Sequence, residues 1–265
     1  MEEKCGVGFI SSKSHPRFGC GTQVEITDGG AKYFIPQKGK KMSKIVIFGA
    51  GKIADVAYFQ LKNDSPHEVV AFTVDGEYLE ENEKWNCPVI PFEDILEQYP
   101  PDDFRMFVAV GYQDMNRFRA KKYTEAKAKG YELISYISSK VANFGEIEIG
   151  DNSFILENAV IQPCTKIGNN VFFWNGNHLG HHASVEDHCY IAGQVIISGA
   201  TVIEPYCFLG VNATIGHELR IGEASFIGAG TLITKNVLPK SVYIAPDTQK
   251  FRLDADTFLR LTKMK

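Results

Sequence analysis

The sequence lacks the features that mark several common protein classes. No apolar run approaches the ~20 residues needed to cross a bilayer. The first residues, MEEKCGVGFISS, contain no cationic start followed by an apolar core, as a secretory signal would. A net charge of -4 gives no basic surface for nucleic acid, and the six cysteines include no C-x-x-C pair typical of zinc or redox sites. We therefore expect a cytoplasmic protein without membrane or nucleic-acid partners.

What the chain does contain is an uninterrupted repeat of six residues. In steps of six from Ile149, every position as far as Ile233 is Ile, Leu, Val or Phe. The position two residues before each next apolar residue is mostly small. A period of six matches neither a helix, with about 3.6 residues per turn, nor a strand, with a period of about two. The repeat indicates a hexapeptide β-helix, in which each rung buries its apolar residues against the rungs above and below.

A different pattern precedes the repeat. Apolar runs predict parallel strands over residues 44–48, 69–74 and 107–110, and an amphipathic helix over 114–129. The first strand leads into a G-x-G-x-x-A turn at residues 49–54, the second ends at Asp75 and the third at Gly111. Backbone amides at a helix N-terminus attract phosphate, and an acidic residue after the second strand meets ribose in Rossmann-type sites. This segment, of about ninety residues, holds one mononucleotide half and not two. A nucleotide-sugar pocket at Gly49, Gly51, Lys52, Asp75 and Gly111 is our interpretation, with a structural cap or a dehydrogenase as alternatives.

Five of the seven histidines lie inside the repeat: His178, His181, His182, His188 and His217. Imidazole is suited to act as a general base near neutral pH. Pro163, His181, Gly199 and His217 are spaced by eighteen residues, so they should form one column on successive coils. With rungs about 4.8 Å apart, His181 and His217 would lie roughly 10 Å apart, with a glycine between them that leaves room for substrate or keeps the corner tight. A metal site is not expected, since corner residues of a solenoid point outward and zinc needs converging ligands.

A small Rossmann-like domain followed by hexads resembles the hexapeptide-repeat sugar acyltransferases that N-acetylate nucleotide-linked amino sugars, together with the sialic acid O-acetyltransferases. The resemblance covers about Lys44 to Ala245 and includes Val110-Gly111 before a helix and the segment Phe208-Leu209-Gly210-Val211-Asn212. It implies a left-handed β-helix with three hexads per coil and five coils between Ile149 and about Leu238. It also implies acetyl-CoA along the coils, the UDP or GDP part of the sugar on the first domain, and homotrimers with active sites between subunits.

The resemblance also assigns residues. The family has a catalytic His followed by an acidic residue; these positions fall on His181 and His182, which departs from the pattern. His181 would then use another partner, Glu186 or Asp187, or share the task with His182. The backbone groups that contact acetyl-CoA fall on Tyr190, Val211 and Ala229.

The expected organisation has four parts: an extension of uncertain structure (1–42), which includes the option of a β-hairpin packed on the body, a Rossmann-like domain (43–135), the β-helix (136–248) and a C-terminal helix that caps the last coil (249–265). The leading hypothesis is an acetyl-CoA-dependent N-acetyltransferase of nucleotide amino sugars in surface-polysaccharide synthesis. The alternatives are a sugar O-acetyltransferase and a non-catalytic trimeric scaffold.

Overall fold

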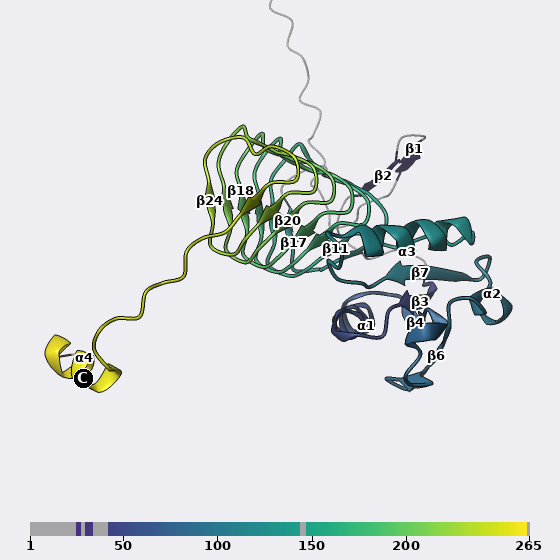
Figure 1. The fold of residues 1–265 in the computed structure, drawn as a ribbon. Helices are drawn as coiled ribbons and strands as arrows, with labels where there is room; N and C mark the ends of the chain where they lie inside the picture. The colour runs from purple at the N-terminus through teal and green to yellow at the C-terminus, as the bar shows by residue number, and fades with distance from the viewer. Residues whose placement is uncertain (1–24, 28–29, 34–41, 144–146, 264–265) are drawn as a thin grey trace, which may run out of the picture.

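The computed structural model describes residues 25–27, 30–33, 42–143 and 147–263 (Figure 1). Its first domain is built on a sheet with the strand order β5-β6-β4-β3-β7. Four strands run parallel, and β5 (Glu83–Lys84) pairs antiparallel with β6. The parallel strands are β3 (Lys44–Phe48), β4 (Glu68–Val74), β6 (Cys87–Pro91) and β7 (Phe104–Val108). The helical segments are α1 (Lys52–Asp64), the short 3-10 helix η1 (Gly76–Tyr78), α2 (Ile95–Gln98) and α3 (Arg117–Ala128).

The three predicted strands of this domain are present; the first has the predicted ends, and the second begins one residue early, at Glu68. The third ends at Val108 and not at residue 110, and the helix after it begins at Arg117 and not at residue 114. The helix starts late because Asp114, Met115 and Asn116 all have positive φ values, between 49° and 68°, which no α-helix contains. Strand β6 was not predicted, since its two prolines are unfavourable in a strand interior.

The second domain is a triangular prism of three parallel sheets, which we name by their outward side chains. The aromatic face consists of β8 (Tyr136–Ile137), β11 (Phe154–Ile155), β14 (Phe172–Phe173), β17 (Tyr190–Ile191), β20 (Phe208–Leu209), β23 (Phe226–Ile227) and β25 (Val242–Tyr243). The uncharged face consists of β9 (Ala142–Asn143), β12 (Val160–Ile161), β15 (His178–Leu179), β18 (Ile196–Ile197), β21 (Thr214–Ile215) and β24 (Leu232–Ile233). The charged face consists of β10 (Ile147–Ile149), β13 (Thr165–Ile167), β16 (Ser184–Val185), β19 (Val202–Ile203) and β22 (Arg220–Ile221).

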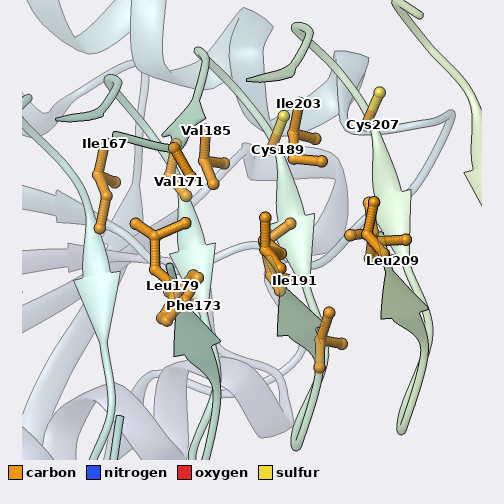
Figure 2. Close-up of a cluster of buried hydrophobic side chains, with 14 of the residues drawn as sticks. Ile167, Val171, Phe173, Leu179, Val185, Cys189, Ile191, Ile203, Cys207 and Leu209 are labelled. Atoms are coloured by element: carbon orange, nitrogen blue, oxygen red, sulfur yellow. The ribbon is translucent and has the colours of Figure 1, made fainter. Parts of the chain in front are cut away.

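Pairing between coils confirms the predicted register. Phe154 pairs with Phe172, which pairs with Tyr190, in steps of eighteen residues. The last coil is shorter, because Phe226 pairs with Val242 only sixteen residues later. All fifteen apolar positions of the repeat are at most 4% exposed, and Figure 2 shows several of them directed into the prism. Complete burial of such a side chain is worth about 1.5–3 kcal/mol, so the repeat stabilises the prism along its whole length.

The corners of the prism have a repeated backbone conformation. Every sixth residue from Asn152 to Gly230 has a positive φ, between 51° and 72°. The left-handed conformation turns the chain at each corner, and asparagine and glycine adopt it at least cost. Cysteine, histidine, tyrosine and glutamate occupy several of these positions, so coil stacking outweighs the local preference.

The first domain packs on the aromatic face of the prism. Tyr136, Phe154, Phe172 and Tyr190 are at most 6% exposed and form one cluster with apolar side chains of α1 and β7. Asn152 adds a polar contact, because its side chain accepts from the Val108 amide at 2.7 Å and donates to the Val108 carbonyl at 3.2 Å. The two domains are therefore joined by an extensive apolar contact with specific hydrogen bonds.

Two further segments flank these domains. Strands β1 (Glu25–Thr27) and β2 (Gly30–Tyr33) form a hairpin, and β2 pairs with β10. Of the two options for the N-terminal extension, this is the hairpin packed on the body. Residues 28–29, between the two strands, lie outside the described part. The C-terminal helix α4 (Ala255–Thr262) is present but has no buried residue, and Figure 1 shows it apart from the coils at the end of an extended segment. It therefore does not cover the last coil, where Leu232, Leu238 and Val242 are more than 60% exposed.

Candidate active site

The five residues predicted to bind substrate all line one pocket. It has a volume of about 390 Å³ and lies at the carboxyl ends of β3, β4 and β7, where ligands bind in open α/β sheets. Gly49, Gly51 and Lys52 come from the turn into α1, Asp75 follows β4, and Gly111 follows β7. The other lining side chains are Phe48, Ile53, Val74, Tyr78, Ala109, Val110, Gln113 and Phe118.

The turn into α1 depends on glycine. Gly49 has a φ of +118°, and a Cβ there would lie 2.7 Å from the Ala109 carbonyl oxygen, so no other residue fits without a backbone shift. The first amides of α1 face the pocket together with the exposed side chain of Lys52. A helix N-terminus beside a cation is a favourable place for phosphate groups.

Asp75 is fixed at the pocket edge by a lysine that the sequence did not single out. The Lys122 ammonium group on α3 donates to Asp75 Oδ1 at 2.6 Å and to Glu125 Oε2 at 2.7 Å. Burial by itself would lower the Lys122 pKa, but the hydrogen bonds to the two carboxylates outweigh it and raise the pKa. Asp75 thus lines the pocket with a carboxylate that Lys122 holds through Oδ1.

His181 and His182 lie at the corner between the uncharged and charged faces, together with His217 two coils further on. We call this the histidine corner. Both residues are exposed, and their Nδ1 atoms are 3.1 Å apart. The His217 ring lies 6.2 Å from that of His181, and its Nε2 is 3.3 Å from Glu218 Oε1. The corner therefore presents exposed imidazole rings to the surface of the prism.

The predicted column of Pro163, His181, Gly199 and His217 is present, since each coil donates a backbone hydrogen bond to the one before. The expected open space above Gly199 is absent. A Cβ at Gly199 would lie 2.8 Å from His181 Cε1 and 2.9 Å from its Nε2, so the imidazole itself fills that space. The glycine therefore serves to seat the catalytic candidate and does not leave room for a substrate arm.

The alternative partners of His181 lie elsewhere. The Asp187 carboxylate accepts from the Asn169 amide at 2.7 Å, and Glu186 lies beside Glu204 and Arg220, at the corner between the charged and aromatic faces. Among the described residues, His182 is the hydrogen-bond partner of the His181 ring.

The three positions assigned to acetyl-CoA do not lie together. Val211 and Ala229 are exposed on successive coils, at the corner between the aromatic and uncharged faces. Tyr190 lies in the middle of the aromatic face, 6% exposed, beneath Tyr112, and its amide donates to the Cys207 carbonyl. Its side chain and its amide are therefore both engaged within the protein, unlike those of an exposed corner residue.

Arg119 is the residue of greatest structural consequence that the sequence analysis missed. It is fully buried between α3 and the prism, and its guanidinium carbon lies 4.6 Å from the Phe172 ring centroid. Burial lowers its pKa to about 10, which still leaves it charged at neutral pH. Asn116 binds the next coil, donating to the carbonyls of Tyr206 and Cys207 at 3.1 and 3.2 Å. No sequence motif distinguishes such an arginine from a solvated one.

The pocket and the histidine corner lie on opposite sides of the prism. The first domain covers the aromatic face, from Asp151, which accepts from Lys127 at 2.6 Å, to Glu157, which accepts from Gln60 at 3.2 Å. The histidine corner is the one corner of a triangular prism that this face does not touch. One chain therefore does not bring the two groups of predicted site residues together.

The fold and these sites define the class as a hexapeptide-repeat β-helix protein with a Rossmann-like first domain. Comparison with known proteins agrees. Residues 146–180 and 164–199 match the model of the bacterial transferase hexapeptide (six repeats), which confirms the predicted repeat. The chain is 34% identical over 108 residues to a UDP-3-O-acylglucosamine N-acyltransferase of Bordetella petrii, a match that covers 39% of this chain and 30% of that protein. The chain thus spans under a third of that relative.

Solved structures share the whole two-domain architecture. PerB from Caulobacter crescentus, a perosamine N-acetyltransferase solved with CoA and GDP-perosamine, superposes with a TM-score of 0.68 at 21% identity, over 77% of this chain and 94% of that one. The acetyltransferase domain of PglB from Neisseria gonorrhoeae gives 0.69 at 22% identity, over 76% and 96%. These likenesses confirm the predicted fold, a Rossmann-like domain followed by a left-handed β-helix.

None of the described helices is long and apolar enough to cross a membrane. Within the described ranges, no three His, Cys, Asp or Glu side chains converge in a way that would hold a metal ion.

Proposed function

We propose that this chain is an acetyl-CoA-dependent N-acetyltransferase that acts on a nucleotide-linked amino sugar. The observation that carries the proposal is the pairing of two features in one chain. All five residues expected to bind a nucleotide line one pocket, and an exposed histidine corner lies on a hexapeptide prism. The relatives named above, which by their names act on nucleotide sugars, support this choice of substrate.

The nucleotide is held by the first domain. The diphosphate lies against the amides at the start of α1 and the ammonium group of Lys52, and the free oxygen of Asp75 accepts from the ribose hydroxyls. Val211 and Ala229 offer backbone groups to acetyl-CoA along their corner. Tyr190 does not contribute a side chain, because the first domain covers it.

His181 acts as the general base. The amine nitrogen of the sugar attacks the thioester carbonyl, and His181 accepts the proton that the nitrogen loses as the C–N bond forms. The C–S bond then breaks, and the departing CoA sulfur takes a proton, which the imidazolium can return. A backbone amide of a neighbouring coil stabilises the oxygen that gains charge during attack.

The complete site lies between two copies in a homotrimer. Because the pocket and the histidine corner lie on opposite sides of one prism, the corner of a second copy must meet the pocket of the first. The uncharged face suits this contact, since the outward residues of its six described strands include no Asp, Glu, Lys or Arg: Ala142, Val160, His178, Ile196, Thr214 and Leu232. An interface core is depleted in charged residues for the same reason as a protein core.

The test is transfer by the purified protein, measured as thiol release from acetyl-CoA with a panel of UDP-, GDP- and dTDP-linked amino sugars. We expect release with one nucleotide class and a loss of at least about a hundredfold in His181→Asn. Lys166→Met is the control, because Lys166 is exposed on the charged face, outside both the histidine corner and the proposed subunit contact. Transfer to hydroxyl acceptors alone would favour the O-acetyltransferase. A stable trimer that binds no CoA in calorimetry would favour the scaffold.

A further inference from the structure

The histidine corner contains a bond between two imidazoles whose direction decides whether His181 can accept a proton. His181 Nδ1 and His182 Nδ1 are 3.1 Å apart, and the two rings are nearly perpendicular, at 83°. A hydrogen bond of this length requires that one Nδ1 carries the hydrogen and the other offers its lone pair. If His182 donates, His181 carries its own hydrogen on Nε2 and cannot act there as a base. If His181 donates, its Nε2 is free.

The surroundings of the pair favour donation from His181 Nδ1 to His182 Nδ1 during catalysis. When His181 gains a proton on Nε2, a bond that it donates from Nδ1 becomes charge-assisted and therefore stronger. The ring is also held in place by its contact with Gly199, so Nδ1 continues to face His182. Among the described residues, the other titratable groups on this corner are His217, Glu218, Lys235 one coil beyond His217, and Cys164 one coil before His182.

We propose that His182 is a positioning residue that accepts the Nδ1 hydrogen of His181 and so keeps the Nε2 of His181 free. This inference rests on the proposed function, in which His181 is the base. His182 then carries its own hydrogen on Nε2. Because the partner is an imidazole and not a carboxylate, it orients the base without adding a negative charge that would favour the protonated form of the base.

The backbone permits clean variants at this position. His182 has a φ of 59°, and the residues of the same column on the flanking coils, Cys164 and Ala200, have values of 62° and 55°. Alanine thus already occupies this site one coil away, and asparagine and aspartate tolerate a positive φ. His182→Ala removes the acceptor, His182→Asn restores one through its side-chain oxygen, and His182→Asp restores one with a charge.

The first measurement is the tautomer of His181, read from the nitrogen chemical shifts of its ring in the intact protein above about pH 8, where imidazoles are neutral. We expect hydrogen on Nδ1 in the unaltered protein and a mixture of tautomers in His182→Ala. Hydrogen on Nε2 in the unaltered protein would overturn the inference. This readout needs no turnover, so it remains decisive even if the proposed acetyl transfer is not observed.

The second measurement is the pH–rate profile of transfer. We expect His182→Ala to lower kcat about tenfold, the value of one hydrogen bond to a charged group, with an unchanged KM for the sugar. His182→Asn should recover most of this loss. His182→Asp should also recover it but move the acid limb of the profile upward by about one pH unit. Lys240→Ala, at an exposed position of another corner with a φ of 60°, is the control. Equal kcat and an equal tautomer in His182→Ala and the unaltered protein would show that His182 has no positioning role.

Discussion

Replacement of Arg119 by alanine tests how the two domains are joined. The guanidinium group is fully buried and contacts the loop before α3 and two coils of the prism. Its acceptors are the Gly111 carbonyl at 2.7 Å, Asn116 Oδ1 at 3.0 Å and the carbonyls of His188, Cys189 and Asn170 at 2.9, 3.2 and 3.3 Å. No carboxylate accompanies the charge among these contacts, so oxygen dipoles and the Phe172 ring hold it.

The expected loss follows from these contacts. Each buried acceptor left without a donor costs about 1 kcal/mol, and the lost cation–π contact about 2 kcal/mol. A cavity between the domains adds to this cost. The variant also avoids the cost of burying a charged guanidinium group, which offsets several kcal/mol of this loss. We therefore expect Arg119→Ala to lower the free energy of unfolding by about 3 kcal/mol.

Urea denaturation of Arg119→Ala and of a control variant on α3 measures this loss of stability. The control is Arg117→Ala, whose ion pair with Asp114 is 3.6 Å long between side chains that are 50% and 73% exposed. Such a surface pair contributes at most about 0.5 kcal/mol. If the two variants had the same stability within this margin, our account of the domain contact would be wrong. Arg119→Ala should also weaken nucleotide binding, because the Gly111 carbonyl that it holds belongs to the pocket.

Three further changes probe the site and the fold. Gly199→Ala should reduce transfer at least about tenfold with little change in stability, since the new Cβ displaces the His181 ring. Lys122→Met should weaken nucleotide binding about tenfold in calorimetry, because Asp75 loses its 2.6 Å ion pair. Burial lowers the pKa of His188 below its usual 6.5, so the stability gained from a neutral His188 is complete above that value and is lost as pH falls below it. His188→Asn should therefore show a smaller drop in melting temperature between about pH 7.5 and 5.5.

Each of these changes has a matched control. Pro163→Ala alters the same column as Gly199 without adding atoms, and equal activity of the two variants would contradict the displacement of the imidazole. Lys121→Met removes the neighbouring lysine, whose side chain is 66% exposed, and should leave nucleotide affinity unchanged. His217→Asn replaces an exposed histidine; a pH dependence as small as that of His188→Asn would show that burial of His188 is not the cause.

The pocket at the sheet edge was predictable because its residues follow a local rule. A glycine turn between an apolar strand and a helix, and polar residues directly after parallel strands, converge at one sheet edge whatever the rest of the chain does. Lys122 was not predictable, because nothing in the pattern of α3 shows that one of its lysines turns inward to Asp75. The helix start was also misplaced, since three consecutive residues with positive φ carry no reliable sequence signal.

The hexad count by itself determined the prism. A residue that recurs every six positions has the same neighbours on every coil, so one observation fixes which side chains face inward from Ile149 to Ile233. Only the tertiary structure decided which contacts the outer faces of the prism make. In the tertiary structure Arg119 is buried against the aromatic face and the His181 ring lies over Gly199. Helix α4 does not cover the last coil, and the pocket lies opposite the histidine corner. The period specifies burial within a coil, whereas these contacts join residues from separate elements that no period relates.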